Sequence, residues 1–343
     1  MSKSEVFADK LRRLTNRAIY RDSMCKELGV SVTECRQLLF ESANSQIPDT
    51  LFKMSGTDDD RNFNRRLEDL RKKRLHMSSP KAFNDPFDCQ PFWDKDKIQS
   101  RLRRTINPDD LRTTINFHKR YILPDDRAQY ELAMNTLMAN LSKRKQAEID
   151  RTLNEIQASY ENIRESYRCS CLTEEKSLGP MWANYADNGR GFMTAYSAQD
   201  LELDCIYRSS KAFCGGSPFC FLLPVIYTGR YDLSQFSSVI GGSEQWYSYQ
   251  TEMALLTFIN SVAYKTPEWS YEKEWRIACS DCPKEEQVYA SLAATALYIG
   301  YNTPKDRTEQ LEACARELSI PVYQAEISTD SAKGRLLFRL LNS

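Results

Sequence analysis

The sequence predicts an α+β protein with a mixed or antiparallel sheet as its core, a long helical insertion within that core, and a small helical unit before it. Three observations lead to this prediction. Residues 1–46 carry apolar residues at helical spacing, residues 95–167 are highly charged and contain no glycine, and the chain from residue 168 onward is rich in β-type segments. We therefore expect four parts, at residues 1–46, 47–94, 95–167 and 168–343.

The N-terminal unit is predicted to begin with a helix over residues 4–20. Residues 23–39 then resemble a helix-turn-helix, in which Gly29 makes the turn and Ser31 caps the second helix. A DNA-binding motif and a set of short helices packed on the core both fit this short pattern. Both interpretations stay open, and DNA contact through residues 23–39 is one partner expectation.

The first core segment is predicted to start with a strand at residues 50–54 and to continue as a helix over residues 63–74. A second strand is expected at residues 75–78. It leads into the turn-rich residues 79–88, where Asp85 stands before a proline and can form an Asx-turn.

The insertion is predicted to form two or three long helices, because apolar residues recur at intervals of three and four between residues 137 and 160. Acidic residues are interspersed with the lysines and arginines, which favours a solvated helical face over a grip on nucleic acid. Contact with a protein partner, or with a second copy of the chain, is a further expectation for this insertion.

The remaining core combines short strands with helices. Helices are predicted over residues 180–186, 243–261 and 305–318. The predicted strands are residues 167–173, 191–196, 221–227, 274–279, 296–300 and 321–327.

Composition argues against several classes of function. The 47 basic residues balance 47 acidic ones, so no global attraction to a polyanion follows. Apolar runs fall short of the ~20 residues of a membrane span, and the N-terminus lacks the pattern of a signal peptide. A cytoplasmic location without a membrane partner is therefore expected.

The histidine and cysteine content of the chain limits the kinds of catalysis and metal binding that we expect. The chain has two histidines, His76 and His118, which argues against catalysis by a nucleophile and an imidazole base. The eleven cysteines include two close pairs but no histidine at metal-ligand spacing, so they are expected to be reduced, buried small hydrophobes. No metal is expected.

Four stretches of the core carry sequence motifs. They are Leu51-Phe-Lys-Met54, Ser79-Pro-Lys-Ala-Phe-Asn-Asp-Pro-Phe-Asp88, Cys169-Ser-Cys-Leu-Thr-Glu174 with Met181–Phe192, and Trp269-Ser-Tyr-Glu-Lys-Glu-Trp-Arg276. Together they resemble the bacterial, abortive-infection-associated family called domain of unknown function 2971. The resemblance spans residues 50–300 and brings no firmly known activity.

The order of these motifs is also similar to that of the ADP-ribosyltransferase fold. That fold begins with a strand carrying a polar anchor for NAD, here Lys53, followed by a helix and a strand. A later helix with Asn184-Tyr185 precedes a strand that starts at Gly191, and the paired glutamates Glu272 and Glu274 open another strand. The anchor in that fold is histidine or arginine, and Lys53 is neither.

This second resemblance implies an NAD-consuming transferase that passes ADP-ribose to an unknown macromolecular acceptor, as a toxin or phage-defence effector. Glu274 would be the catalytic carboxylate, because glycosidic cleavage develops positive charge that a carboxylate stabilises. Glu272 would orient the acceptor. The implied NAD-binding residues are Lys53, Asn84, Asp85, Ser170, Thr173, Trp182 and Tyr185.

Alternatives remain for these residues. The charged residues of Glu272–Arg276 also fit an exposed charge ladder on a strand whose neighbouring aromatics lie in the core, namely Trp269, Tyr271 and Trp275. Trp182 and Tyr185 also fit core aromatics of a buried helix. A non-enzymatic regulator or antitoxin-like module is the second functional hypothesis. The third is a Mg²⁺-dependent nuclease that uses the carboxylates of Asp85, Asp88, Glu272 and Glu274.

Overall fold

The computed structural model describes the core and parts of both helical regions. The described residues are 3–23, 47–57, 59–90, 92–105, 167–200, 220–232, 250–280, 287–328 and 334–342, with 234, 282 and isolated positions between 132 and 165. The predicted helix-turn-helix lies outside the described residues from residue 24 onward. Most of the helical insertion also lies outside them, so the partner expectations for both segments stay predictions.

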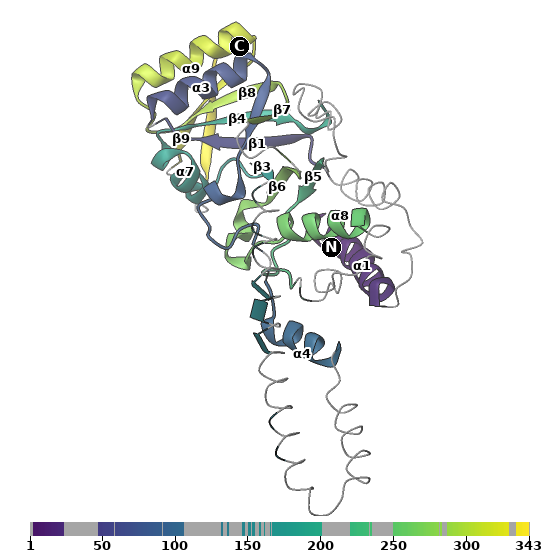
Figure 1. Ribbon diagram of the computed structural model, residues 1–343. Helices are drawn as coiled ribbons and strands as arrows, with labels where there is room; N and C mark the ends of the chain where they lie inside the picture. Colours follow the sequence, from purple (N-terminus) through teal and green to yellow (C-terminus); the bar gives the residue numbers. More distant parts are fainter. Residues whose placement is uncertain are drawn as a thin grey trace, which may run out of the picture.

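The protein has an α+β fold built on one eight-stranded sheet (Figure 1). The strand order is β10-β9-β8-β4-β1-β3-β6-β5, and every neighbouring pair is antiparallel except β8 and β9, which are parallel. A separate two-stranded sheet joins β2 to β7. The predicted α+β fold is confirmed, and its mixed or antiparallel sheet proves to be mostly antiparallel.

Most of the strands and helices overlap the predicted segments, whereas β7 and β10 were not predicted. The strands are β1 (Thr50–Ser55), β2 (Arg74–Met77), β3 (Arg168–Thr173), β4 (Phe192–Ser197), β5 (Cys220–Pro224), β6 (Glu274–Cys279), β7 (Val288–Ser291), β8 (Ala294–Ile299), β9 (Val322–Ile327) and β10 (Leu336–Asn342). The longer helices are α1 (Lys3–Ser23), α3 (Asp60–Arg71), α4 (Lys95–Thr105), α7 (Gly179–Tyr185), α8 (Gln250–Val262) and α9 (Lys305–Leu318). Short 3₁₀ helices include η1 (Pro80–Ala82) and η9 (Pro267–Glu272).

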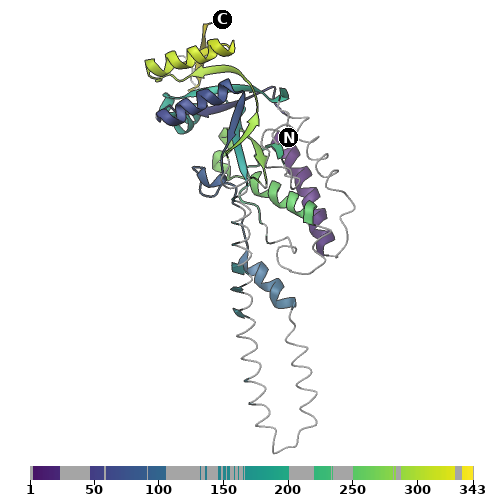
Figure 2. The ribbon, with the colours of Figure 1, turned by 45° about the horizontal axis from the view of Figure 1, so that its top comes forward.

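Two helix pairs pack against the sheet. Helices α3 and α9 lie side by side at one end of the molecule (Figures 1 and 2), where Phe63 and Leu311 are fully buried in one cluster. Helices α1 and α8 form the second pair, and Asn260 of α8 donates a hydrogen bond to Thr15 of α1 at 3.0 Å. Among the described helices, none combines the length and apolarity that crossing a bilayer requires.

The close approach of β1 to the start of β4 requires a glycine. A Cβ built on Gly191 would lie 2.1 Å from the Ser55 carbonyl oxygen and 2.9 Å from the Ala186 Cα. The neighbouring Gly189 has φ +79°, which favours glycine as well. The glycines of the turn at residues 189–191 therefore have a conformational and packing reason.

The sheet is nearly divided between β1 and β3. Strand β1 pairs with β4 over six residues, and β3 pairs with β6 over six, but β1 and β3 share the single pair Phe52 and Thr173. Away from that pair the backbones of the two strands are not joined. The Lys53 ammonium instead reaches the Cys171 carbonyl oxygen of β3 at 3.0 Å. The two halves of the sheet therefore separate beside this lysine.

Candidate active site

A cavity of about 360 Å³ lies where the two halves of the sheet separate. Its walls come from β1, β2, β3, β4, α3, α7, the segment 82–88 and the segment 265–274. A cavity of this size suits a small ligand. Chain segments that are distant in sequence thus contribute side chains to one space.

The two glutamates of the Glu-x-Glu motif enter this cavity from adjacent elements. Glu272 ends η9, Lys273 takes a left-handed conformation with φ 45°, and Glu274 begins β6. The Glu274 N–H donates to the Tyr227 hydroxyl at 2.8 Å, and the Thr173 hydroxyl donates to the Glu272 carbonyl oxygen at 2.5 Å. These bonds fix the backbone, so both side chains line the cavity.

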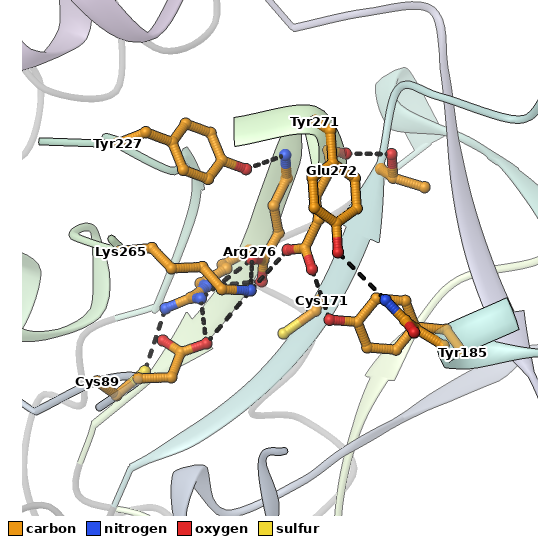
Figure 3. Close-up of polar contacts among 12 residues, drawn as sticks. Cys89, Cys171, Tyr185, Tyr227, Lys265, Tyr271, Glu272 and Arg276 are labelled. Atoms are coloured by element: carbon orange, nitrogen blue, oxygen red, sulfur yellow. Dashed lines mark hydrogen bonds and ion pairs between the residues drawn. The ribbon is translucent and has the colours of Figure 1, made fainter. Parts of the chain in front are cut away.

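A buried lysine links the two carboxylates (Figure 3). The Lys265 ammonium lies 2.6 Å from Glu272 Oε2, 3.1 Å from Glu274 Oε2 and 3.6 Å from Asp88 Oδ2. It also lies 4.8 Å from the centre of the Trp269 ring, a cation–π contact. Its side chain is 5% exposed, so these interactions act in a poorly screened environment.

Arg276 of β6 completes the charge cluster, with no part of its side chain exposed. Its Nε donates to Glu274 Oε1 at 2.7 Å, and its Nη2 donates to Glu274 Oε2 at 3.1 Å and to Asp88 Oδ2 at 2.7 Å. Its Nη1 donates to the Val262 carbonyl oxygen at 2.8 Å. A buried guanidinium is tolerated when its donors are satisfied in this way.

The two glutamates differ in their ease of protonation. Burial and the neighbouring Glu274 charge raise the pKa of Glu272 to about 7, although Lys265 and the Tyr185 hydroxyl oppose this. Burial also acts on Glu274, but Arg276 and Lys265 outweigh it and hold its pKa well below the usual range. In this cluster three carboxyl groups face two cations, so the cluster is neutral when Glu272 is protonated.

These contacts decide between the alternatives for the motif. The exposed charge ladder is wrong for Glu272, Glu274 and Arg276, because all three are buried, whereas Trp275 does lie in the core. Lys265 and Arg276 lie against the carboxylates of Asp88 and Glu274 that the nuclease hypothesis assigns to Mg²⁺. Protein cations thus already neutralise those oxygens.

Five of the seven residues implied for NAD binding line the cavity. They are Lys53, Asn84, Asp85, Thr173 and Tyr185. The Asp85 carboxylate accepts from the Phe87 N–H at 2.8 Å, which is the expected Asx-turn. The structure therefore brings most of the implied ligand contacts together.

Trp182 and Ser170 lie outside the cavity lining. The Trp182 ring is fully buried, its Nε1 donates to the Lys176 carbonyl oxygen at 2.8 Å, and it packs near Phe338. Ser170 is buried within β3. Of the two aromatic residues of α7 that were implied for NAD binding, Trp182 thus lies in the core and Tyr185 in the cavity.

Tyr185 contacts the paired glutamates directly. Its hydroxyl donates to Glu272 Oε1 at 2.5 Å (Figure 3). The adjacent Asn184 amide donates to the Tyr271 hydroxyl at 3.2 Å. Helix α7 is thereby held against η9 by two hydrogen bonds, of which the one between Tyr185 and Glu272 lies at the cavity.

The cations of this site are not evident from the sequence. Lys265 follows an apolar helix, and its sequence neighbours give no sign that it is buried. Arg276 belongs to the last motif, but nothing in that motif identifies Asp88 as its partner. His76, Arg65, Arg66 and Arg74 also line the cavity. The alternation of charge in Glu272, Glu274 and Arg276 is the signal from which a buried ion-pair cluster could have been suspected.

Comparison with known proteins bears on the acidic part of this cavity. The family described as "Protein of unknown function (DUF2971)" matches residues 181–277, a stretch that contains Tyr185, Lys265, Glu272, Glu274 and Arg276. Searches of curated proteins and of solved structures return no match. Residues 181–277 of the chain are therefore similar to the DUF2971 family of proteins of unknown function.

Proposed function

We propose that this cavity is the active site of an enzyme that cleaves the nicotinamide–ribose bond of NAD and passes ADP-ribose to an acceptor. The observation that carries the proposal is the pair Glu272 and Lys265, buried at the wall of the cavity. A carboxyl group with a pKa of about 7 in a cavity is suited to take up and release a proton at neutral pH.

The order of the elements supports the same proposal. Lys53 lies on β1, which is followed by α3 and β2. Helix α7 with Tyr185 precedes β4, and Glu274 opens β6. This is the order in which the ADP-ribosyltransferase resemblance expects its anchor, its helices and its glutamate.

The proposed reaction has two steps, cleavage of the glycosidic bond and attack by a nucleophile. The bond between ribose C1′ and the nicotinamide nitrogen breaks, and its electron pair neutralises the pyridinium charge of the leaving group. The cation left on the ribose is stabilised by a nearby carboxylate, as in glycoside cleavage. A water or acceptor nucleophile then attacks C1′ and loses its proton to ionised Glu272.

The contacts favour Glu272 over Glu274 as the reactive carboxylate. Arg276 and Lys265 neutralise much of the Glu274 charge, so this residue is better suited to position the two cations. Glu272 faces Lys265 and the neutral Tyr185 hydroxyl, and it can gain or lose a proton. We therefore propose Glu272 as the reactive carboxylate, in place of Glu274, to which the sequence resemblance gave that role. A toxin or phage-defence setting rests on the family resemblance alone.

The test is incubation of the full chain with NAD and chromatographic measurement of free nicotinamide. Water, arginine, nucleic acid and a bacterial extract would be supplied in turn as acceptors. Release that rises with enzyme concentration supports the proposal. The absence of nicotinamide under every condition rejects it, and nucleic-acid cleavage that requires Mg²⁺ would favour the nuclease hypothesis in its place.

A further inference from the structure

A second part of the cavity lining is basic and takes no part in the charge cluster around Lys265. It consists of Lys53 on β1, Arg65, Arg66 and Asp69 on α3, and Arg74 and His76 on β2. Arg74 is paired, because its Nε donates to the Asp69 carboxylate at 2.7 Å and its guanidinium lies over the Tyr289 ring at 3.9 Å. The other cations of this basic wall are Lys53, Arg65 and Arg66.

Arg65 and Lys53 have unused capacity to donate hydrogen bonds. The Arg65 Nε is buried and has no hydrogen-bond partner within the part of the chain that the structure describes. The Lys53 ammonium has three N–H donors, and it donates to the Cys171 carbonyl oxygen, which carries no charge. A buried donor without an acceptor is costly, so an acceptor that enters the cavity would relieve that cost.

His76 reports the electrostatic potential at this wall. Burial lowers its pKa to about 4, and the charges of Arg65, Lys53, Arg168 and Arg66 contribute to this lowering. Its ring lies edge-on to Tyr289, and its Nδ1 lies 3.5 Å from the Ser78 hydroxyl. The imidazole is therefore neutral at pH 7, and the wall around it is positive.

The basic wall is carried by regular secondary structure. Strand β1 and helix α3 follow each other directly, and α3 starts with Asp59 as its cap, whose carboxylate accepts from the Asn62 N–H at 3.0 Å. The Arg66 guanidinium donates to the Gly56 carbonyl oxygen in the loop between them. The cations are thus positioned before a ligand arrives.

We propose that Lys53, Arg65 and Arg66 form an anion subsite that takes the diphosphate group of a nucleotide. Arginine matches phosphate oxygens with paired donors, and lysine adds a point charge. The acidic cluster lines another part of the same cavity, where a ribose and its cationic base would lie. The identity of the ligand rests on the proposed function, whereas the anion subsite does not.

The test observes His76 by NMR while inorganic pyrophosphate is added at constant ionic strength. The variant His118→Gln leaves His76 as the one histidine of the chain. Saturable binding is expected, together with a rise of the His76 pKa from about 4 towards its ordinary value, because the anion cancels the neighbouring positive charges. A titration with ADP is expected to give the same response.

Two variants make this test specific. Arg65→Met is expected to weaken pyrophosphate binding about tenfold or more, because a charge-assisted contact is lost. Arg316→Met removes an arginine of α9 that is 63% exposed and should leave the binding unchanged. Circular dichroism would establish that both variants are folded.

The anion subsite is rejected if pyrophosphate does not bind to the wild-type chain. It is also rejected if pyrophosphate binds to Arg65→Met as tightly as to the wild-type chain. If pyrophosphate binds but NAD is never cleaved, the subsite stands and the proposed reaction falls. If NAD is cleaved but Arg65→Met changes neither pyrophosphate binding nor the KM for NAD, the reaction stands and the subsite falls.

Discussion

The Lys265 ammonium lies 2.6 Å from the Glu272 carboxylate, and both side chains are almost wholly buried. Asp88 and Glu274 share Lys265 and the second cation, Arg276, with Glu272, so ionisation of Glu272 leaves the buried cluster with one uncompensated negative charge. This pair therefore couples the stability of the core to the protonation of a carboxyl group that faces the cavity.

Replacement of Lys265 by methionine is expected to destabilise the protein strongly. Glu272, Glu274 and Asp88 would keep one cation, Arg276, and loss of one partner of a buried pair costs about 3–5 kcal/mol. Urea unfolding at pH 8 measures the change. Lys305→Met, at a side chain that is 91% exposed, is the control and should stay within about 0.5 kcal/mol of wild type. A loss below about 1 kcal/mol for Lys265→Met would contradict the buried cluster.

The variant Glu272→Gln is expected to stabilise the protein in alkaline solution. The folded-state pKa of Glu272, about 7, lies above its ordinary value of 4.5, so ionisation opposes folding. The wild-type chain therefore loses stability relative to the glutamine variant as the pH rises from about 4.5 through 7. The full difference is on the order of 3 kcal/mol.

Urea unfolding of both chains at pH 4.5 and pH 8 checks this pH dependence. The two free energies of unfolding should nearly agree at pH 4.5, because glutamine mimics the protonated acid. The variant should be the more stable protein at pH 8. A variant that is less stable at pH 8 would mean that the Lys265 contact outweighs the cost of burial.

Tyr185→Phe is expected to shift the pH dependence of catalysis. The Tyr185 hydroxyl donates to Glu272 and stabilises the ionised form, so its removal should raise the pKa of Glu272 further above 7. The rate of nicotinamide release should then require higher pH to reach its plateau. Tyr289→Phe is a matched control outside this hydrogen bond. An unchanged pH profile in Tyr185→Phe would show that this contact does not set the protonation of Glu272.

The glycine at the start of β4 gives a test of the fold. Gly191→Ala would place a Cβ 2.1 Å from the Ser55 carbonyl oxygen, so the backbone of β1 must shift. We expect a loss of about 1–3 kcal/mol, as for other overpacked sites. Gly179→Ala is the control, because no atom lies within 4 Å of the position that a Cβ would take there. Equal melting temperatures for the two variants would show that β1 and β4 are not packed this closely.

The elements of the core could largely be predicted from the sequence, because their patterns are local. The predicted strand at residues 274–279 and helix at residues 305–318 coincide with β6 and α9. The strands β7 and β10 are absent from the prediction. Strand β7 has four residues and pairs with the equally short β2, and β10 is an edge strand whose side chains are largely exposed. Neither carries a strong alternation of apolar and polar residues.

The candidate site was predictable in part. The motifs contain Glu272, Glu274, Tyr185 and Lys53, and the fold brings all of them to one cavity. The ion-pair and hydrogen-bond partners of these residues could not be predicted from the spacing of residues in the sequence. Asp88 and Arg276 are 188 positions apart in the chain, and their contact depends on how the segment after η1 packs against β6. Trp182 lies in the core, which is the alternative that the sequence also allowed, because sequence spacing alone does not determine how a side chain packs in the tertiary structure.

The most direct test compares nicotinamide release by the wild-type chain and by Glu272→Gln at pH 8 and saturating NAD. The glutamine side chain keeps the shape and the contact with Lys265 but cannot accept a proton, so the rate should fall by a factor of about 100 or more. Glu268→Gln, at an exposed glutamate of η9, should keep the wild-type rate. A Glu272→Gln chain that releases nicotinamide as fast as wild type would contradict the role assigned to Glu272.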